Sequence, residues 1–293
     1  MFYSGFLIKQ ITIKTNEYRE FSEADSYFTF TPDEENEGAK SLINIGLKED
    51  DWFVSFHSRD PSYLKTLPSS KYIDYSYHDF RNCQIEKFYK GMNNVIDRGG
   101  FALQVGSVIE QQLRSETNTR LIDYAGKHRT DFMDIYVNAR CRFFIGNTSG
   151  LFHVPKAFGT PYAITNLIGF LHISPQPNSL FIPKLIRDKK SDKIISFMKL
   201  KELGLFNEEY GKAAYHAEFY ETNNMEVIEN TEDEIAELVD DMFDLTNKNK
   251  PDLGEIELQR FFKDIYYNEN PDRHDAGNLA PSFIRRHEKI LFP

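Results

Sequence analysis

The 293-residue sequence has few cysteines, no long apolar run and no excess of positive charge. Its two cysteines, Cys83 and Cys141, stand in dissimilar contexts, which supports neither a disulfide scaffold nor a metal cluster and fits a reducing compartment. No run predicts a membrane span, and the N-terminus lacks the apolar core of a signal peptide, so we expect a cytoplasmic protein. The formal net charge of −10 argues against nucleic acid as a partner.

The motifs of several common enzyme classes are also missing. Neither Gly-x-Gly-x-x-Gly nor a Walker loop occurs, which disfavours a dinucleotide oxidoreductase and an NTPase. Asp-x-Asp, the usual metal site of single-domain sugar transferases, does not occur either. His153 and His172 have no partner at metal-ligand spacing. We therefore expect no metal and no cofactor.

Strand-like apolar runs alternate with helical segments between residues 51 and 166. This alternation predicts an α/β fold, a Rossmann-like parallel sheet with helices on both faces, followed by C-terminal helices. We expect three parts: an N-terminal segment and lead-in helix (1–48), a ligand-binding domain (49–246) and a C-terminal helical segment (247–293). The expected strands are 52–56, 101–105, 142–146 and 162–165, and residues 6–8 and 11–13 also resemble strands.

The central stretch of the chain, residues 131–166, contains a short polar turn flanked by glycines. An expected strand precedes this turn and an amphipathic segment, 151–158, follows it. Such a turn presents backbone N–H groups and hydroxyls to an anion at a helix N-terminus. The glycines would let the backbone turn sharply, and the three polar residues could cap the helix. The alternative is an ordinary capped turn, because this is no signature phosphate loop. The residues of the turn are Gly146, Asn147, Thr148, Ser149 and Gly150.

A second polar group, His57, Arg59 and Asp60, follows the first expected strand. The planar guanidinium of Arg59 could hold a phosphate bidentately, and Asp60 could orient it. His57 could shuttle a proton or donate to an anion. The alternative is a surface Arg–Asp pair beside a half-buried histidine.

The polar loops at the strand ends point to one shared site. Gly106 and Ser107 follow the second expected strand, as residues 57–60 and 146–150 follow two others. Ligands of parallel sheets bind beyond the carboxyl ends of the strands, so we expect these loops to converge. Lys184 is a further candidate phosphate contact, although a solvated loop lysine would have the same sequence.

Five segments, in their order along the chain, resemble a bacterial family of glycosyltransferases that is found with surface-polysaccharide genes. The His-x-Arg-Asp element and the Gly-x-x-Ser-Gly turn are also similar to the donor-binding half of fucosyltransferase-like enzymes of the two-Rossmann (GT-B) type. The resemblance covers about residues 28–293. The segments are WFVSFHSRDPSYL (52–64), YHDFRNCQIEKFY (77–89), 131–166, FIPK (181–184) and ENTEDEI (229–235).

The resemblance implies metal-independent transfer of a sugar from a nucleotide-sugar donor to a surface-glycan or lipid-linked acceptor. It implies that Arg59 and the 147–149 turn hold the donor diphosphate, and a GDP-sugar is slightly favoured. The chain departs from the pattern at Gln104, where a basic residue is expected, and in the short segment before its first strand. It could therefore be a natural short form, a fragment, or a donor domain that takes its acceptor site from a partner chain or a second copy.

Two other functions fit the same architecture. A sugar-nucleotide epimerase would need an acid/base pair that faces the sugar, and the sequence does not identify one. A non-catalytic nucleotide-sugar-binding module is favoured by the missing acceptor half.

Overall fold

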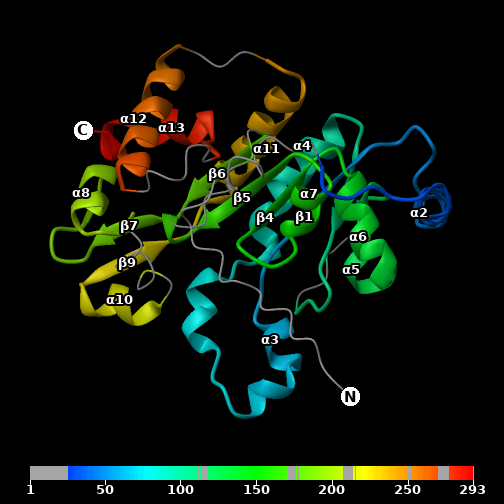
Figure 1. Cartoon of the computed structure of the whole chain (residues 1–293), viewed down its shortest axis with the longest axis horizontal. Coiled ribbons are helices and arrows are strands. Elements are labelled where there is room, and N and C mark those ends of the chain that lie inside the picture. Colours follow the sequence, from blue (N-terminus) through cyan, green and yellow to red (C-terminus); the bar gives the residue numbers. More distant parts are fainter. Residues whose placement is uncertain are drawn as a thin grey trace, which may run out of the picture.

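A sheet of seven parallel strands forms the centre of the fold (Figure 1). The computed structural model describes residues 26–110, 113, 118–170, 176, 178–206, 214, 216–249, 253–269 and 277–292. The strand-like residues 6–8 and 11–13 lie outside this part of the chain. In sheet order the strands are β10 (Asn278–Leu279), β6 (Ser179–Pro183), β5 (Tyr162–Leu167), β4 (Phe144–Asn147), β1 (Phe53–His57), β2 (Phe101–Gln104) and β3 (Leu121–Ile122).

Helices cover both faces of this sheet, as the sequence predicted. Adjacent residues of a strand point to opposite faces, and Ser55 and Phe56 of β1 show both. The Ser55 hydroxyl donates to the Val137 carbonyl of α6, 3.1 Å away, whereas the Phe56 ring contacts Phe88 in front of α4. The α/β class is therefore confirmed. One face carries α4 (Tyr89–Asp97) and α11 (Glu232–Thr246), and the other carries α5 (Tyr124–Lys127), α6 (Asp131–Arg140) and α7 (His153–Ala157).

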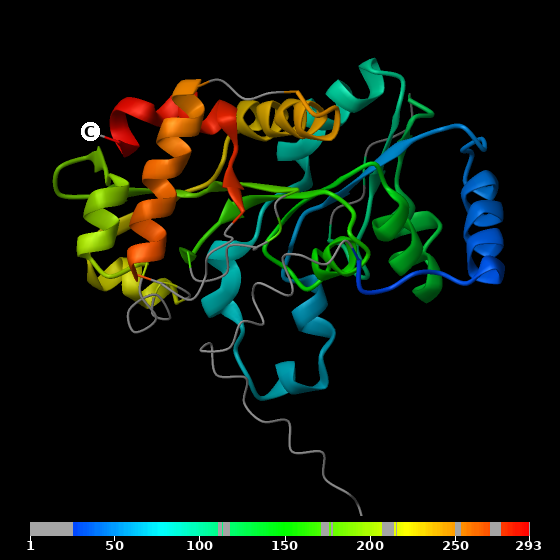
Figure 2. The same cartoon turned by 45° about the horizontal axis from the view of Figure 1, so that its top comes forward.

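The lead-in helix α2 (Pro32–Asn44) packs against the outer side of α6 (Figures 1 and 2). Thr31 and Glu34 form a capping box at the start of α2. Glu35 accepts hydrogen bonds from Tyr136 and Arg140 of α6. These contacts attach the N-terminal helix to the face opposite α4 and α11.

A small antiparallel sheet and two closing helices complete the described chain. The small sheet contains β8 (Lys193–Ile194), β7 (Leu185–Asp188) and β9 (Met225–Ile228), near α8 (Phe197–Glu202) and α10 (Ala217–Thr222). The predicted C-terminal helices are α12 (Leu253–Glu269) and α13 (Pro281–Leu291), and β10 between them pairs with β6. Within the described residues, no helix is both long and apolar enough to span a membrane.

One segment projects away from these layers, beyond the end of β1 (Figure 2). It runs from Asp60 to Cys83 and contains α3 (Ser62–Thr66) and the 3₁₀ turns η1 (Pro68–Lys71) and η2 (Ser76–Arg81). A further turn, η3 (Ile85–Phe88), returns the chain to the core, where Ile85 and Phe88 are buried.

Candidate functional site

The direction in which strands are added to the sheet reverses between β1 and β4. From β1 the chain adds β2 and β3 on one side, and then crosses back to place β4 on the other side of β1. Open α/β sheets bind ligands beyond the carboxyl ends of the strands at such a switch point. His57 ends β1 and is the register partner of Gly146 in β4. The fold therefore places the two main polar groups of the sequence at its preferred binding edge.

Hydrogen bonds join the predicted loops 57–60, 106–107 and 146–150. The Arg59 N–H donates to Asn147 Oδ1 over 2.6 Å, which links the ends of β1 and β4. His57 Nδ1 lies 3.0 Å from the Val105 carbonyl oxygen, which links β1 to the end of β2. Gly106, with a φ of 153°, lies against the same imidazole, while Ser107 is exposed. The structure thus brings the three loops together, as we expected.

The imidazole of His57 is held in its neutral form. Burial lowers the pKa of His57, and the bond to the Val105 carbonyl opposes this only in part. Since a carbonyl oxygen only accepts, Nδ1 carries the proton and Nε2 is left as an acceptor. A neutral His57 can accept a proton but adds no positive charge to the site.

A segment that lies across the strand ends, residues 79–83, carries a second arginine of the site. We call it the strap. Its backbone is bonded on both sides: Asn147 Nδ2 donates to the Arg81 carbonyl over 2.7 Å, and the Cys83 N–H donates to the Arg59 carbonyl over 2.9 Å. Arg81 also donates to the Thr148 carbonyl over 3.2 Å. The strap therefore fixes Arg81 beside the end of β4.

The two guanidinium groups lie close enough to affect each other's charge. Burial and then the like charge of Arg81 lower the pKa of Arg59 to about 10, and Asp79 and Asp60 oppose this. The Arg59 side chain donates to Asn82 Oδ1 within the strap. Two partly buried guanidinium groups at one strand edge are donors that could bind an anion. Arg81 lies in the segment 77–89, but only the folded strap places it at the site.

A buried hydroxyl without a partner belongs to a residue of this region. Thr148 is 6% exposed, and its Oγ1 has no hydrogen-bond partner in the part of the chain that the structure describes. The Thr165 hydroxyl, on the strand next to β4, is in the same state. Buried polar atoms are nearly always satisfied, so such atoms indicate a missing partner. A bound phosphate oxygen would supply one to Thr148.

The turn after β4 does not cap a helix, which corrects our expectation. Helix α7 begins only at His153, its N-cap is Phe152 without a side-chain bond, and it has five residues. Ser149 instead accepts a hydrogen bond from the Leu151 N–H over 3.3 Å. The chain forms bends at 148–150, where the Ser149 side chain bonds locally. An anion here would thus depend on side-chain donors, and not on a helix dipole.

The two glycines of the turn also have other roles than we predicted. Neither has a positive φ. Gly146 lies inside β4, where an added Cβ would be 2.8 Å from the Phe144 ring and 3.1 Å from the His57 carbonyl. Gly150 has open space around its Cα. Gly146 therefore permits close packing, and Gly150 leaves room next to the turn.

Asp60 and Lys184 make other contacts than those we expected. The two oxygens of Asp60 accept backbone N–H groups of Ser62 and Glu110, both over 2.8 Å, and Asn82 accepts from Arg59. Lys184 is 4% exposed; its Nζ donates to the Phe80 carbonyl over 2.6 Å and lies 3.6 Å from Glu229. Burial lowers the pKa of Lys184. Asp60 thus joins the chain at Ser62 to the chain at Glu110, and Lys184 holds the strap through the Phe80 carbonyl.

Two asparagines that were not predicted as site residues, Asn166 of β5 and Asn230, bond to each other at this edge of the sheet. The Asn166 N–H donates to Asn230 Oδ1 over 2.6 Å, and the Asn230 N–H donates to Asn166 Oδ1 over 2.8 Å. Asn166 also donates to the sulfur of Cys83 in the strap. Its φ of 52° is a conformation that asparagine tolerates better than most residues. The only sequence signal was that Asn166 is the last residue of the segment 131–166 and Asn230 the second residue of the segment 229–235.

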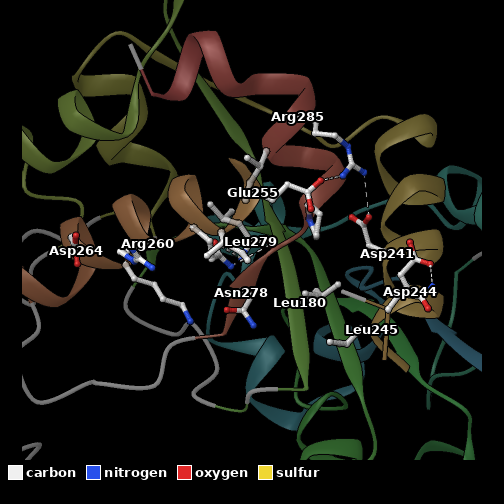
Figure 3. A pocket seen from close by; sticks show the side chains of 16 residues that line it. Leu180, Asp241, Asp244, Leu245, Glu255, Arg260, Asp264, Asn278, Leu279 and Arg285 are labelled. Atoms are coloured by element: carbon white, nitrogen blue, oxygen red, sulfur yellow. Dashed lines mark hydrogen bonds and ion pairs between the residues drawn. The ribbon is translucent and has the colours of Figure 1, made fainter. Parts of the chain in front are cut away.

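The largest cavity that we describe lies at another part of the fold (Figure 3). It has a volume of about 630 Å³ and is bounded by α11, α12, α13 and β10. Arg285 pairs with Glu255 and with Asp241 on its wall. Leu180, near the start of β6, forms part of its floor. Since the candidate site lies beyond the strand ends, this cavity is separate from it.

Within the described residues, no cluster of three or more His, Cys, Asp and Glu side chains could hold a metal ion. Comparisons with protein-family models, with curated proteins and with solved structures found no match to this chain. The functional argument therefore depends on the site itself.

Proposed function

We propose that this chain is a glycosyltransferase that transfers a sugar from a nucleotide-sugar donor to a glycan or lipid-linked acceptor. The observation that supports this best is the pair Arg59 and Arg81 beside the unpartnered Thr148 hydroxyl. Their place at the β1/β4 switch point is where α/β folds bind phosphorylated ligands. The resemblance of the quoted segments to polysaccharide glycosyltransferases supplies the reaction class.

The two arginines would act on the leaving group. When the bond between the anomeric carbon and the phosphate oxygen breaks, negative charge develops on the nucleoside diphosphate. Fixed cations and hydrogen-bond donors that already surround this position stabilise the charge without reorganising. Arg59 and Arg81 are partly withdrawn from water, which strengthens their effect on a bound anion. This mechanism needs no metal ion, and metal independence remains part of the proposal.

The sheet would correspond to the donor-binding half of a GT-B enzyme. In this proposal the nucleotide lies across the ends of β1, β4 and β5, and the acceptor approaches from the side of the projecting segment. A partner chain or a second copy is the expected source of any further acceptor contacts.

A panel of nucleotide sugars tests this proposal. The purified chain is incubated with GDP-, UDP-, ADP- and dTDP-sugars and with a CMP-sugar, with and without EDTA, and nucleotide release is measured. We expect release from at least one donor, unchanged by EDTA, and its loss in Arg59→Ala. Interconversion of the sugars would indicate an epimerase, and binding without turnover would indicate a binding module. If no nucleotide binds even at millimolar concentration, the proposal fails.

A further inference from the structure

The projecting segment between β1 and the strap forms an open cavity of its own. Eleven residues between Pro61 and Asp79 line a volume of about 510 Å³, which is within the usual range of small-molecule sites. Neither α3 nor η1 contains a buried residue. The segment therefore adds nothing to the hydrophobic core, and a long loop of this kind usually serves a function.

The wall of this cavity combines an exposed aromatic face with polar groups. Tyr72 is 89% exposed and Ile73 is 46% exposed. Two serines, two lysines and two aspartates also line it, so its charges balance. A neutral ligand with many hydroxyl groups and one apolar face matches this wall better than an anion does. The polar lining residues are Lys65, Ser70, Lys71, Asp74, Ser76 and Asp79.

Local hydrogen bonds give the segment a defined shape. The Ser69 hydroxyl and the Tyr75 phenol lie 2.9 Å apart. Asp74 accepts from the Ser76 N–H over 2.9 Å and from its hydroxyl over 3.0 Å. Such local hydrogen bonds of serine and aspartate side chains stabilise turns that lack a core. The cavity is therefore largely formed before a ligand arrives.

Asp79 connects this cavity to the arginine site. It lines the cavity, and its Oδ1 accepts from Asn82 Nδ2 over 2.9 Å. Asn82 in turn accepts from the Arg59 guanidinium, and the charge of Asp79 partly opposes the lowering of the Arg59 pKa. Pro61, which also lines the cavity, is two residues after Arg59. The cavity and the anion site are thus neighbours.

We propose that this cavity binds the acceptor sugar, a neutral hexose or N-acetylhexosamine unit, with its apolar face against the Tyr72 ring. This inference rests on the glycosyltransferase function proposed above. An acceptor hydroxyl near Asp79 would then lie beside a donor whose diphosphate is bound by Arg59 and Arg81. The hydroxyl oxygen would form the new bond to the anomeric carbon, the nucleoside diphosphate would leave with the electron pair, and the hydroxyl proton would pass to water.

The test compares Tyr72→Ala with Tyr63→Ala. Tyr63 lies on α3 of the same segment and is 51% exposed, but it does not line the cavity, so it is a matched control. Both substitutions remove an exposed ring and should leave the fold intact. Sugar binding is measured by saturation-transfer NMR with glucose, galactose, N-acetylglucosamine, lactose and cellobiose. Nucleotide binding is measured on the same samples by calorimetry.

We expect at least one sugar to bind the wild type and Tyr63→Ala equally, and to bind Tyr72→Ala about tenfold more weakly. Nucleotide affinity and donor hydrolysis should be the same in all three proteins. Equal sugar binding by both variants, or no binding of any panel sugar to the wild type, would overturn the acceptor site. If sugar binding depends on Tyr72 but no nucleotide binds, the glycosyltransferase proposal fails and a carbohydrate site remains.

Discussion

Replacement of Arg59 by alanine should change ligand binding much more than stability. The backbone bonds of this residue, to Asn147 and Cys83, do not use its side chain and would remain. The loss of the hydrogen bond to Asn82 should cost about 1 kcal/mol. Against this, a pKa lowered from 12.5 to about 10 indicates that the charged guanidinium is unfavourable in its site. Without solvent screening, this lowering of the pKa would destabilise the folded state by about 3 kcal/mol. Because Arg59 is partly exposed, screening reduces the destabilisation to about 1 kcal/mol.

The two effects nearly cancel, so the free energy of unfolding of Arg59→Ala should lie within about 1 kcal/mol of the wild type. In contrast, the loss of a charge-assisted contact to a diphosphate costs about 2–3 kcal/mol, or roughly 30- to 140-fold in the dissociation constant. Arg59→Lys should recover only part of the affinity, because an ammonium group cannot form the bidentate contact of a guanidinium.

Denaturant melts and calorimetric titrations of the same protein samples measure both quantities. Arg98→Ala is the control: this arginine follows α4, at the edge where the strands begin, and pairs with Asp240 over 2.9 Å. The control should lose no nucleotide affinity. If Arg59→Ala melts several degrees lower while it binds nucleotide like the wild type, Arg59 is a structural residue and the anion site is refuted.

Three further predictions concern the same edge. Thr148→Val should keep or raise the free energy of unfolding, because it removes a buried hydroxyl without a partner. It should weaken nucleotide binding by at most about tenfold in calorimetry, and tighter binding would contradict the site. Gly146→Ala should lower the free energy of unfolding by about 1–3 kcal/mol, since its Cβ would meet the Phe144 ring, and an unchanged melt would contradict this packing. Burial lowers the pKa of His57, so below about pH 6.5 the unfolded chain takes up a proton that the folded chain resists. The free energy of unfolding should therefore decrease as the pH is lowered, by up to about 1.4 kcal/mol per pH unit from this group. Denaturant melts of His57→Gln between about pH 8 and about pH 5.5 should show a smaller decrease than the wild type, and an equal decrease would refute the effect.

The sequence could predict those parts of the fold that depend on local signals. The four expected strands are present as β1, β2, β4 and β5, and each pairs in parallel with its neighbours. Their apolar residues form short runs between polar or glycine-containing turns, which is typical of strands buried on both faces. Thr31 and Thr231 form capping boxes at the starts of α2 and α11, and such a box is a local signal because all its groups lie within four residues.

Features that depend on distant partners could not be predicted in the same way. Strand β10 has two residues, and only its pairing with β6 makes it a strand. Arg81 reaches the site because the strap bonds to Thr148, which is 67 residues further along the chain. Asn166 and Asn230 are 64 residues apart and bond only after β5 and α11 have packed together. Local patterns contain no information about such contacts.

The strap connects segments that lie far apart in the sequence. It bonds to Arg59 at the end of β1, and to Asn147 and Thr148 after β4. It also bonds to Asn166 at the end of β5 and to Lys184 after β6. Arg59 lies in the segment 52–64 and Lys184 in the segment 181–184, while Asn147, Thr148 and Asn166 lie in the segment 131–166. The strap itself is part of the segment 77–89. Buried polar groups that satisfy one another are costly to change singly, because each loss leaves a partner unsatisfied. The segments therefore form one hydrogen-bonded unit, and its geometry, with two guanidinium groups held at the switch point, is the property that an anion-binding function would require.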